Sequence, residues 1–332
     1  MLIVSNIKIQ YDEKGQYQKV KLLFDQQYRS TCRFQFPTPT MPTDELGLEI
    51  PAFGAQAAIH AVDLGASRIE LNAKGSYPEG GLTPQSEDLK VLISSGLKVP
   101  LRIMIRPRGP PQTSFNASSV AVGAHNRDFI YTDEEFAAME TSIDSLLSTG
   151  LLDEVRGDGF VFGILAEGRP GSHSKEPETS DTVNQLPRCR VDKERCTRLV
   201  EASRPFKAIF HRAYDEIVSC DSDLSATSAR SSWESGLEDL AACGFDGILT
   251  SGGLGKAIDN IEMLNKIITK AKPLGIQIII GGGIRTVNIG ELVDTLSLRD
   301  RGMSVYTHSA CLHVNTTDEI DPDEVRGILR QL

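Results

Sequence analysis

Eight short apolar segments recur along this chain, each followed by a helical pattern or by a loop that leads to one. Such alternation is typical of parallel strands joined by crossover helices. Eight consecutive units favour closure of the sheet into a barrel over an open, doubly wound sheet. The sequence therefore predicts an α/β fold, a single (β/α)8 TIM barrel, which 332 residues can form as one domain. The predicted strands are 46–53, 68–72, 101–106, 160–165, 207–211, 247–251, 277–281 and 304–309.

The remaining sequence comprises one extension and three inserts. Residues 1–45 form an N-terminal extension, in which two alternating runs around a Gly-containing turn predict a β-hairpin, and residues 46–332 form the barrel. Three stretches near 110–128, 168–190 and 219–232 are rich in Ser, Pro, Gly or Asn and lack an apolar period, so we expect loops there. Each stretch follows a predicted strand, which places it on the rim that carries the active site in this fold.

Composition and charge exclude several classes of partner. Hydrophobic residues make up 40% of the chain, and no apolar stretch approaches the roughly 18 residues that cross a bilayer. The formal net charge is −10, and no cluster of Lys and Arg with interleaved aromatic residues appears, so we expect neither a membrane nor a nucleic-acid partner. The N-terminus shows no secretory signal and the cysteines match no zinc-site or redox spacing, which predicts a cytoplasmic protein with reduced thiols. The six cysteines are Cys32, Cys189, Cys196, Cys220, Cys243 and Cys311.

Residue parity places polar side chains inside the predicted barrel. Side chains on a strand alternate between its two faces, and the apolar ones should face the helices. The side chains that then point toward the barrel axis include Glu49, Glu70, Arg106 and His211. An unpaired buried charge is costly, so these groups must pair or meet a ligand. Arg106 and His211 end their strands, a position that indicates catalysis in this fold; a buried network of carboxylates against Arg106 is the alternative.

An arginine motif extends the third predicted strand. In Arg106-Pro107-Arg108 the proline fixes the backbone, so that the two guanidinium groups need not compete for one position. Two fixed guanidinium groups suit a carboxylate or a phosphate. Two solvated arginines at the entrance of a loop are the alternative.

A histidine motif extends the fifth predicted strand. His211 is followed by Arg212 and Asp215, and a histidine beside an arginine and a carboxylate can act as an acid–base set. A core histidine whose hydrogen bonds are satisfied is the alternative. The predicted catalytic residues are Glu70, Arg106, Arg108, His211, Arg212 and Asp215.

Two glycine-rich turns follow the sixth and seventh predicted strands. Ser251, Gly252 and Gly253 lie in the first turn, and Gly282 and Gly283 lie in the second. Bare glycines let backbone N–H groups approach an anion, so both turns are candidates for binding a cofactor or a phosphate. Tight turns without any ligand are the alternative.

Two further patterns carry less information. His308, Cys311 and His313 combine ligand types that soft metals accept, but their spacing fits no established site, and we leave the metal ligands unassigned. Lys207 could suggest a Schiff-base enzyme, yet it lies below His211, at the end of the strand opposite to the expected active site.

Seven short motifs occur in a fixed order along the predicted barrel: GASRIEL, EGGLTP, MIRPRG, FHRAYD, LTSGG, GGGI and HSA. In this order they resemble the CutC copper homeostasis family over about residues 46–332, as in a eukaryotic-type homologue with extra loops. The resemblance implies a TIM barrel, a cytoplasmic location, homo-oligomers, and an association with copper tolerance and Cu(I) binding. Copper in that family is linked to cysteines near the ends of strands one and two. This sequence has residues 51–53, Pro-Ala-Phe, and Asn72 at those places.

Two functions therefore remain open. The first is copper handling, with Cu(I) as the bound partner. The second is an enzyme that acts on a small anionic substrate, a phosphate or a carboxylate, with Arg106 and Arg108 binding the anion. In that case His211 is the general acid or base, and Glu70 or Asp215 orients it.

Overall fold

The structure consists of two compact units, Met1–Thr43 and Asp44–Leu332. In the first unit, β1 (Ile7–Tyr11) pairs antiparallel with β2 (Tyr17–Leu22). Most residues of the three predicted inserts lie outside the part of the chain that the computed structural model describes. The described residues are 7–11, 17–22, 46–111, 127–168, 189–220, 231–316 and 318–332.

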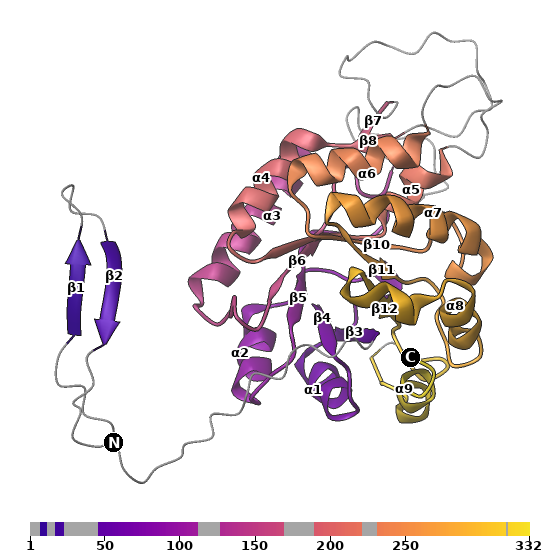
Figure 1. The fold of residues 1–332 in the computed structure, drawn as a ribbon, viewed down its shortest axis with the longest axis horizontal. Coiled ribbons are helices and arrows are strands. Elements are labelled where there is room, and N and C mark those ends of the chain that lie inside the picture. The colour runs from indigo at the N-terminus through magenta and orange to yellow at the C-terminus, as the bar shows by residue number, and fades with distance from the viewer. Residues whose placement is uncertain are drawn as a thin grey trace, which may run out of the picture. The chain divides into compact units, whose positions relative to one another are not determined.

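Parallel strands form a closed barrel in the second unit (Figure 1). Neighbouring strands follow the order of the chain, and the last strand pairs with the first to close the barrel. The barrel strands are β3 (Gly47–Phe53), β4 (Arg68–Asn72), β5 (Leu101–Met104), β6 (Gly159–Phe162), β9 (Lys207–Phe210), β10 (Gly247–Thr250), β11 (Gln277–Ile280) and β12 (Val305–His308). The prediction of a TIM barrel is therefore confirmed. Arg106 and His211 lie just beyond their strands, because β5 ends at Met104 and β9 at Phe210.

The helices surround the barrel, and their ends follow local sequence signals. Thr132 and Glu135 form a capping box at the start of α3, and Gly244 ends α6 in a left-handed conformation with φ 87°. The α-helices are α1 (Ala55–Asp63), α2 (Ser86–Ser94), α3 (Asp133–Ser148), α4 (Lys193–Ser203), α5 (Ala213–Ser219), α6 (Ser232–Cys243), α7 (Ile261–Ala271), α8 (Ile289–Thr295) and α9 (Pro322–Leu329). The 3-10 helices are η2 (Tyr77–Glu79), η3 (Ala257–Asn260), η4 (Lys272–Leu274) and η5 (Leu298–Ser304).

Two apolar clusters fill the barrel unit. The larger cluster lies between the strands and the helices and contains Ile69, Leu71 and Ile103. A smaller one lies along the barrel axis, where Met104 and Ile209 belong to it. These positions have the parity that the sequence predicts. The axial cluster lies beneath the polar residues of the barrel mouth, so the core supports the site from below.

Smaller elements complete this unit. A two-stranded antiparallel ribbon joins β7 (Leu165–Glu167) to β8 (Cys189–Val191). The Lys207 side chain is half exposed and forms an ion pair with Asp246, so it takes no part in the barrel mouth. Among the helices of the described residues, none combines the length and the apolar character that crossing a membrane requires.

Candidate functional site

A cavity of about 660 Å³ opens at the carboxyl ends of the barrel strands. Of the predicted catalytic residues, all but Arg108 line it. Of the predicted turn residues, Gly282 and Gly283 do so, whereas Ser251 lines a smaller neighbouring cavity of about 70 Å³. Most of the side chains predicted from the sequence therefore lie at one cavity, although several of their partners differ from the expected ones.

The guanidinium group of Arg106 is hydrogen-bonded to other residues of the protein. Its Nη2 atom donates to both carboxylate oxygens of Asp128, at 3.0 and 2.9 Å. Its Nη1 atom donates to the carbonyl oxygens of Glu79 and Gly81, the latter at 3.1 Å. The guanidinium group also lies over the ring of Phe129, 5.2 Å from its centroid. Little of its donor capacity is left for a ligand, because only the buried Nε lacks a partner among the described residues.

Arg108 binds a different part of the chain. Its Nε donates to Glu135 at 2.5 Å, and its Nη2 donates to the carbonyl oxygen of Ile130 at 2.8 Å. Because Glu135 also closes the capping box of α3, Arg108 holds the first turn of that helix. Arg106 and Arg108 therefore do not converge on one ligand, contrary to the expected pair of anion-binding guanidinium groups.

Glu49 is paired inside the barrel with residues other than Arg106. Its carboxylate forms a buried ion pair with Arg68 and accepts a hydrogen bond from Nδ1 of His308 at 2.7 Å. Arg68 in turn lies 3.8 Å from the centroid of the Tyr306 ring. Burial alone would raise the pKa of Glu49, but Arg68 and His308 lower it to about 2. Glu49 is therefore ionised at neutral pH. Parity would have placed Arg68 on the same inward face as Glu70, although the sequence prediction did not include it.

Glu70 lies beside this pair with an incomplete set of partners. Its Oε1 accepts a hydrogen bond from Asn72 at 3.1 Å, whereas its buried Oε2 has none among the described residues. Burial raises the pKa of Glu70. Glu49, Glu70 and His308 each offer a ligand atom, and these atoms lie within 4.8 Å of one another. In the described part of the chain, this is the one group of three or more His, Cys, Asp or Glu side chains that could hold a metal ion.

The other side chains of the His308, Cys311 and His313 pattern lie apart from one another. His313 is half exposed and pairs with Asp321 at 3.3 Å. Cys311 is buried, and burial raises the pKa of its thiol to about 11. Of His308, Cys311 and His313, only His308 belongs to the metal-ligand group described above.

His211 is buried as a neutral imidazole. Its Nδ1 accepts a hydrogen bond from the backbone N–H of Ala213 at 3.3 Å, which assigns the proton to Nε2. Burial and the nearby Arg106 charge lower the pKa of His211 to about 3. Its ring packs on Phe129, and Nε2 has no partner among the described residues. At neutral pH this side chain is therefore a hydrogen-bond donor rather than a readily protonated base.

Asp215 fills the first glycine-rich turn with its own carboxylate. The side chain accepts hydrogen bonds from Thr250 Oγ1 at 2.5 Å and from Ser251 N and Oγ at 3.0 and 2.8 Å. Gly253 N donates to it at 3.3 Å, and Gly252 N donates to Thr250 Oγ1 at 2.9 Å. The backbone at this turn does attract an anion, but the anion is part of the protein. The backbone N–H groups of Ser251, Gly252 and Gly253 are therefore already hydrogen-bonded within the protein. They are not available to the cofactor that we expected at this turn.

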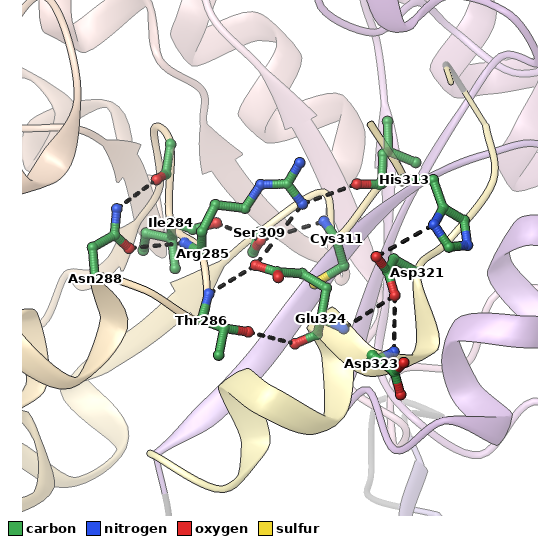
Figure 2. Close-up of polar contacts among 12 residues, drawn as sticks. Ile284, Arg285, Thr286, Asn288, Ser309, Cys311, His313, Asp321, Asp323 and Glu324 are labelled. Atoms are coloured by element: carbon green, nitrogen blue, oxygen red, sulfur yellow. Dashed lines mark hydrogen bonds and ion pairs between the residues drawn. The ribbon is translucent and has the colours of Figure 1, made fainter. Parts of the chain in front are cut away.

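The second glycine-rich turn keeps its donors. Gly282 and Gly283 have φ values of 101° and 69°, which glycine adopts without strain. Their amide N–H groups have no hydrogen-bond partner within the described residues. Two hydrogen bonds anchor the turn. Ser309 Oγ donates to the carbonyl oxygen of Ile284 at 2.8 Å (Figure 2). Arg285 Nη1 donates to the carbonyl oxygen of Leu312 at 3.0 Å. The loops after β11 and β12 are thereby held together at the cavity wall.

Comparisons with known proteins agree with this architecture. The CutC family model matches residues 183–305. The family protein CutC of Parabacteroides distasonis is 31% identical over 74% of this chain and 76% of its own. The copper homeostasis protein cutC homolog of Drosophila melanogaster is 30% identical over 86% of this chain and 85% of its own. A crystal structure of CutC from Streptococcus agalactiae has a TM-score of 0.56 at 22% identity and covers 80% of this chain and 99% of that one, which supports the fold. The chain belongs to the CutC family.

Proposed function

We propose that this chain serves in copper homeostasis, the role after which its Drosophila relative is named. We also propose that Glu49, Glu70 and His308 form an ion-binding cluster. The observation that supports the site is the buried Oε2 of Glu70, which has no partner among the described residues. A buried carboxylate oxygen without a partner is costly, and a bound cation would remove that cost.

The chemistry of the donors decides which ion fits. Two carboxylates and an imidazole suit a divalent ion such as Cu(II) better than the soft Cu(I). Arg68 already neutralises much of the charge of Glu49, so Glu70 and His308 are the more available ligands. Glu49 would then orient His308 through its Nδ1 hydrogen bond, as carboxylates commonly do for metal-binding histidines.

Cu(II) titration followed by calorimetry tests this proposal. Glu70→Gln and His308→Ala should each weaken Cu(II) binding at least about tenfold, since even an outer partner of a metal ligand is commonly worth about 10–100-fold. Glu79→Gln is the matched control, because Glu79 lines the same cavity outside the cluster. Equal affinity in all variants would rule out the cluster as the site. Failure of the wild type to bind copper in either oxidation state would rule out the copper role.

A second candidate function is binding of a small phosphate or carboxylate in the same cavity. The observation in its favour is a set of donors without protein partners: His211 Nε2 and the N–H groups of Gly282 and Gly283. Arg212 is exposed at the same cavity and forms no ion pair with another described residue. In an enzyme, His211 would act as a neutral donor to the substrate, because its low pKa leaves few imidazolium ions at neutral pH.

Thermal-shift measurements with phosphorylated and carboxylated metabolites test the second candidate. A bound anion should raise the melting temperature of the wild type, and His211→Ala and Arg212→Ala should reduce that rise. Arg108→Ala is the comparison, since Arg108 does not line the cavity. A rise of equal size in all four proteins would place the anion elsewhere.

We also propose a cytoplasmic location and a homo-oligomeric assembly. The cysteines of the described residues form no disulfide with one another, which suits a reducing compartment. Light scattering coupled to size-exclusion chromatography would test the assembly, and a mass of one chain would contradict it.

A further inference from the structure

Two cysteines that are distant in sequence meet beside the barrel. The Sγ atoms of Cys189 and Cys220 lie 3.8 Å apart, although 31 residues separate them. Cys189 begins β8, and Cys220 follows the last residue of α5. Neither cysteine forms a disulfide. Sequence spacing could not reveal this pair, because Cys189 and Cys196 are closer along the chain.

We propose that Cys189 and Cys220 form a Cu(I) site. The proposal rests on the copper role proposed above and assigns it a second, chemically distinct set of ligands. Thiolates are the protein ligands that Cu(I) prefers, whereas the carboxylates and the imidazole of the barrel cluster are harder.

The distance between the two sulfur atoms suits a bridging ion. A metal–thiolate bond is about 2.3 Å long, taking zinc as the guide, so two such bonds span at most about 4.6 Å. Two-coordinate Cu(I) favours a nearly linear S–Cu–S arrangement, so sulfur atoms 3.8 Å apart could share one ion once rotation of the two side chains lets them separate toward this limit. A disulfide would require them to approach to about 2.0 Å. The observed separation is a contact between two thiols, well outside a disulfide bond and close enough for one ion to reach both sulfur atoms.

The surroundings offer access and a compensating charge. Cys189 is fully buried, whereas Cys220 is partly exposed, so an ion can reach the pair from the side of Cys220. The hydrogen bond with Cys220 and burial raise the pKa of Cys189, and the nearby Arg127 acts in the opposite direction. Two thiolates with one Cu(I) carry a net charge of −1, which the Arg127 guanidinium would offset in part, since Glu216 acts in the opposite direction. Arg127 also pairs with Glu216 at 3.4 Å, which holds it at this position.

The test is an anaerobic titration of the full chain with Cu(I) against a chromophoric chelator. The wild type should bind Cu(I) with an X-ray absorption spectrum typical of sulfur ligands. Cys189→Ser and Cys220→Ser should each weaken Cu(I) binding at least about tenfold. Cys311→Ser is the matched control, a thiol in the cavity wall whose loss should leave binding unchanged. Because the Cys220 side chain is only partly buried, Cys220→Ser should not disturb folding. Melting temperatures would verify that all variants are folded.

The outcomes separate this proposal from the broader copper role. If Cu(I) binds equally well to both cysteine variants, or only nitrogen and oxygen ligands appear, the thiol site is wrong. Loss of Cu(II) binding in Glu70→Gln would still support the copper role in that case. Quantitation of thiols before and after reduction adds a further criterion: a pair that is isolated oxidised and takes up no Cu(I) once reduced would also overturn the thiol site.

Discussion

At the scale of single residues, neighbours shift the pKa values of two similar carboxyl groups in the barrel mouth in opposite directions. Glu49 and Glu70 are both buried carboxyl groups, yet the pKa of Glu49 falls to about 2 while that of Glu70 rises. Burial acts on both in the same direction, so the difference comes from Arg68 and His308, which contact Glu49 directly. Glu49 therefore keeps its negative charge at neutral pH, and Glu70 is the carboxyl group that a bound cation would help to ionise.

Removal of Arg68 should be costly for this reason. Arg68→Met leaves the buried Glu49 without its ion-pair partner, which we expect to lower the free energy of unfolding by about 3–5 kcal/mol. Urea unfolding would measure the loss. Adding Glu49→Gln should recover much of it, because the unpaired charge disappears. Lys207→Met breaks the half-exposed pair with Asp246 and should cost no more than about 1 kcal/mol. An equal loss in Arg68→Met and the double variant would contradict the explanation.

His211 should make the protein less stable in mild acid. Its pKa is about 3 in the folded chain and near 6.5 when unfolded, so between these values the unfolded state binds the additional proton. This contribution to stability is complete above about pH 6.5 and declines as the pH falls, by at most about 1.4 kcal/mol per pH unit. His211→Gln should therefore show a weaker decline between pH 7 and 5 in urea unfolding. His60→Gln, on the exposed side of α1, should keep the wild-type slope. A slope unchanged in His211→Gln would refute the assignment.

At the scale of secondary-structure elements, the local sequence pattern predicted most of the architecture but few of the hydrogen-bond partners of the site residues. Short apolar segments located all eight barrel strands, and residue parity placed Glu70 and His211 toward the barrel axis, where both line the cavity. The partners of Arg108 and of the turn at Ser251 could not be found this way, because Glu135 and Asp215 come from other elements. Which carboxylate reaches which donor depends on packing between elements, and a strand's own sequence does not record it.

The start of α3 offers a test at this scale. Thr132→Ala removes the side chain that accepts a hydrogen bond from Glu135 N at 3.2 Å, and we expect a loss of about 0.5–2 kcal/mol in the free energy of unfolding. Thr141→Ala, an exposed position within the same helix, should change it by no more than about 0.5 kcal/mol. Denaturant unfolding of both variants would distinguish them. Similar losses would show that the cap does not stabilise α3.

At the scale of the whole molecule, closure of the barrel joins distant parts of the chain. The last strand, β12, pairs with the first, β3, and Thr307 Oγ1 donates to the carbonyl oxygen of Gly47 at 2.9 Å. The same closure brings His308 beside Glu49, which lies 259 residues away. Glu49, Glu70 and His308, which we propose as an ion-binding cluster, therefore come together only when the barrel is complete. Sequence motifs near either end could indicate the fold, but they could not show that His308 completes this cluster.

Gly47 is where this closure is most tightly packed. A Cβ atom at this position would lie 2.2 Å from Cζ of Tyr306, far inside van der Waals contact. The ring cannot easily withdraw, because the Arg68 guanidinium packs on it at 3.8 Å. Gly47→Ala should therefore lower the free energy of unfolding by at least about 1–3 kcal/mol, as overpacked cores do. In a Tyr306→Leu background the same substitution should cost much less, and a urea-unfolding double-mutant cycle measures the difference. If Gly47→Ala costs the same in both backgrounds, contact with Tyr306 is not what requires glycine at the seam between β3 and β12.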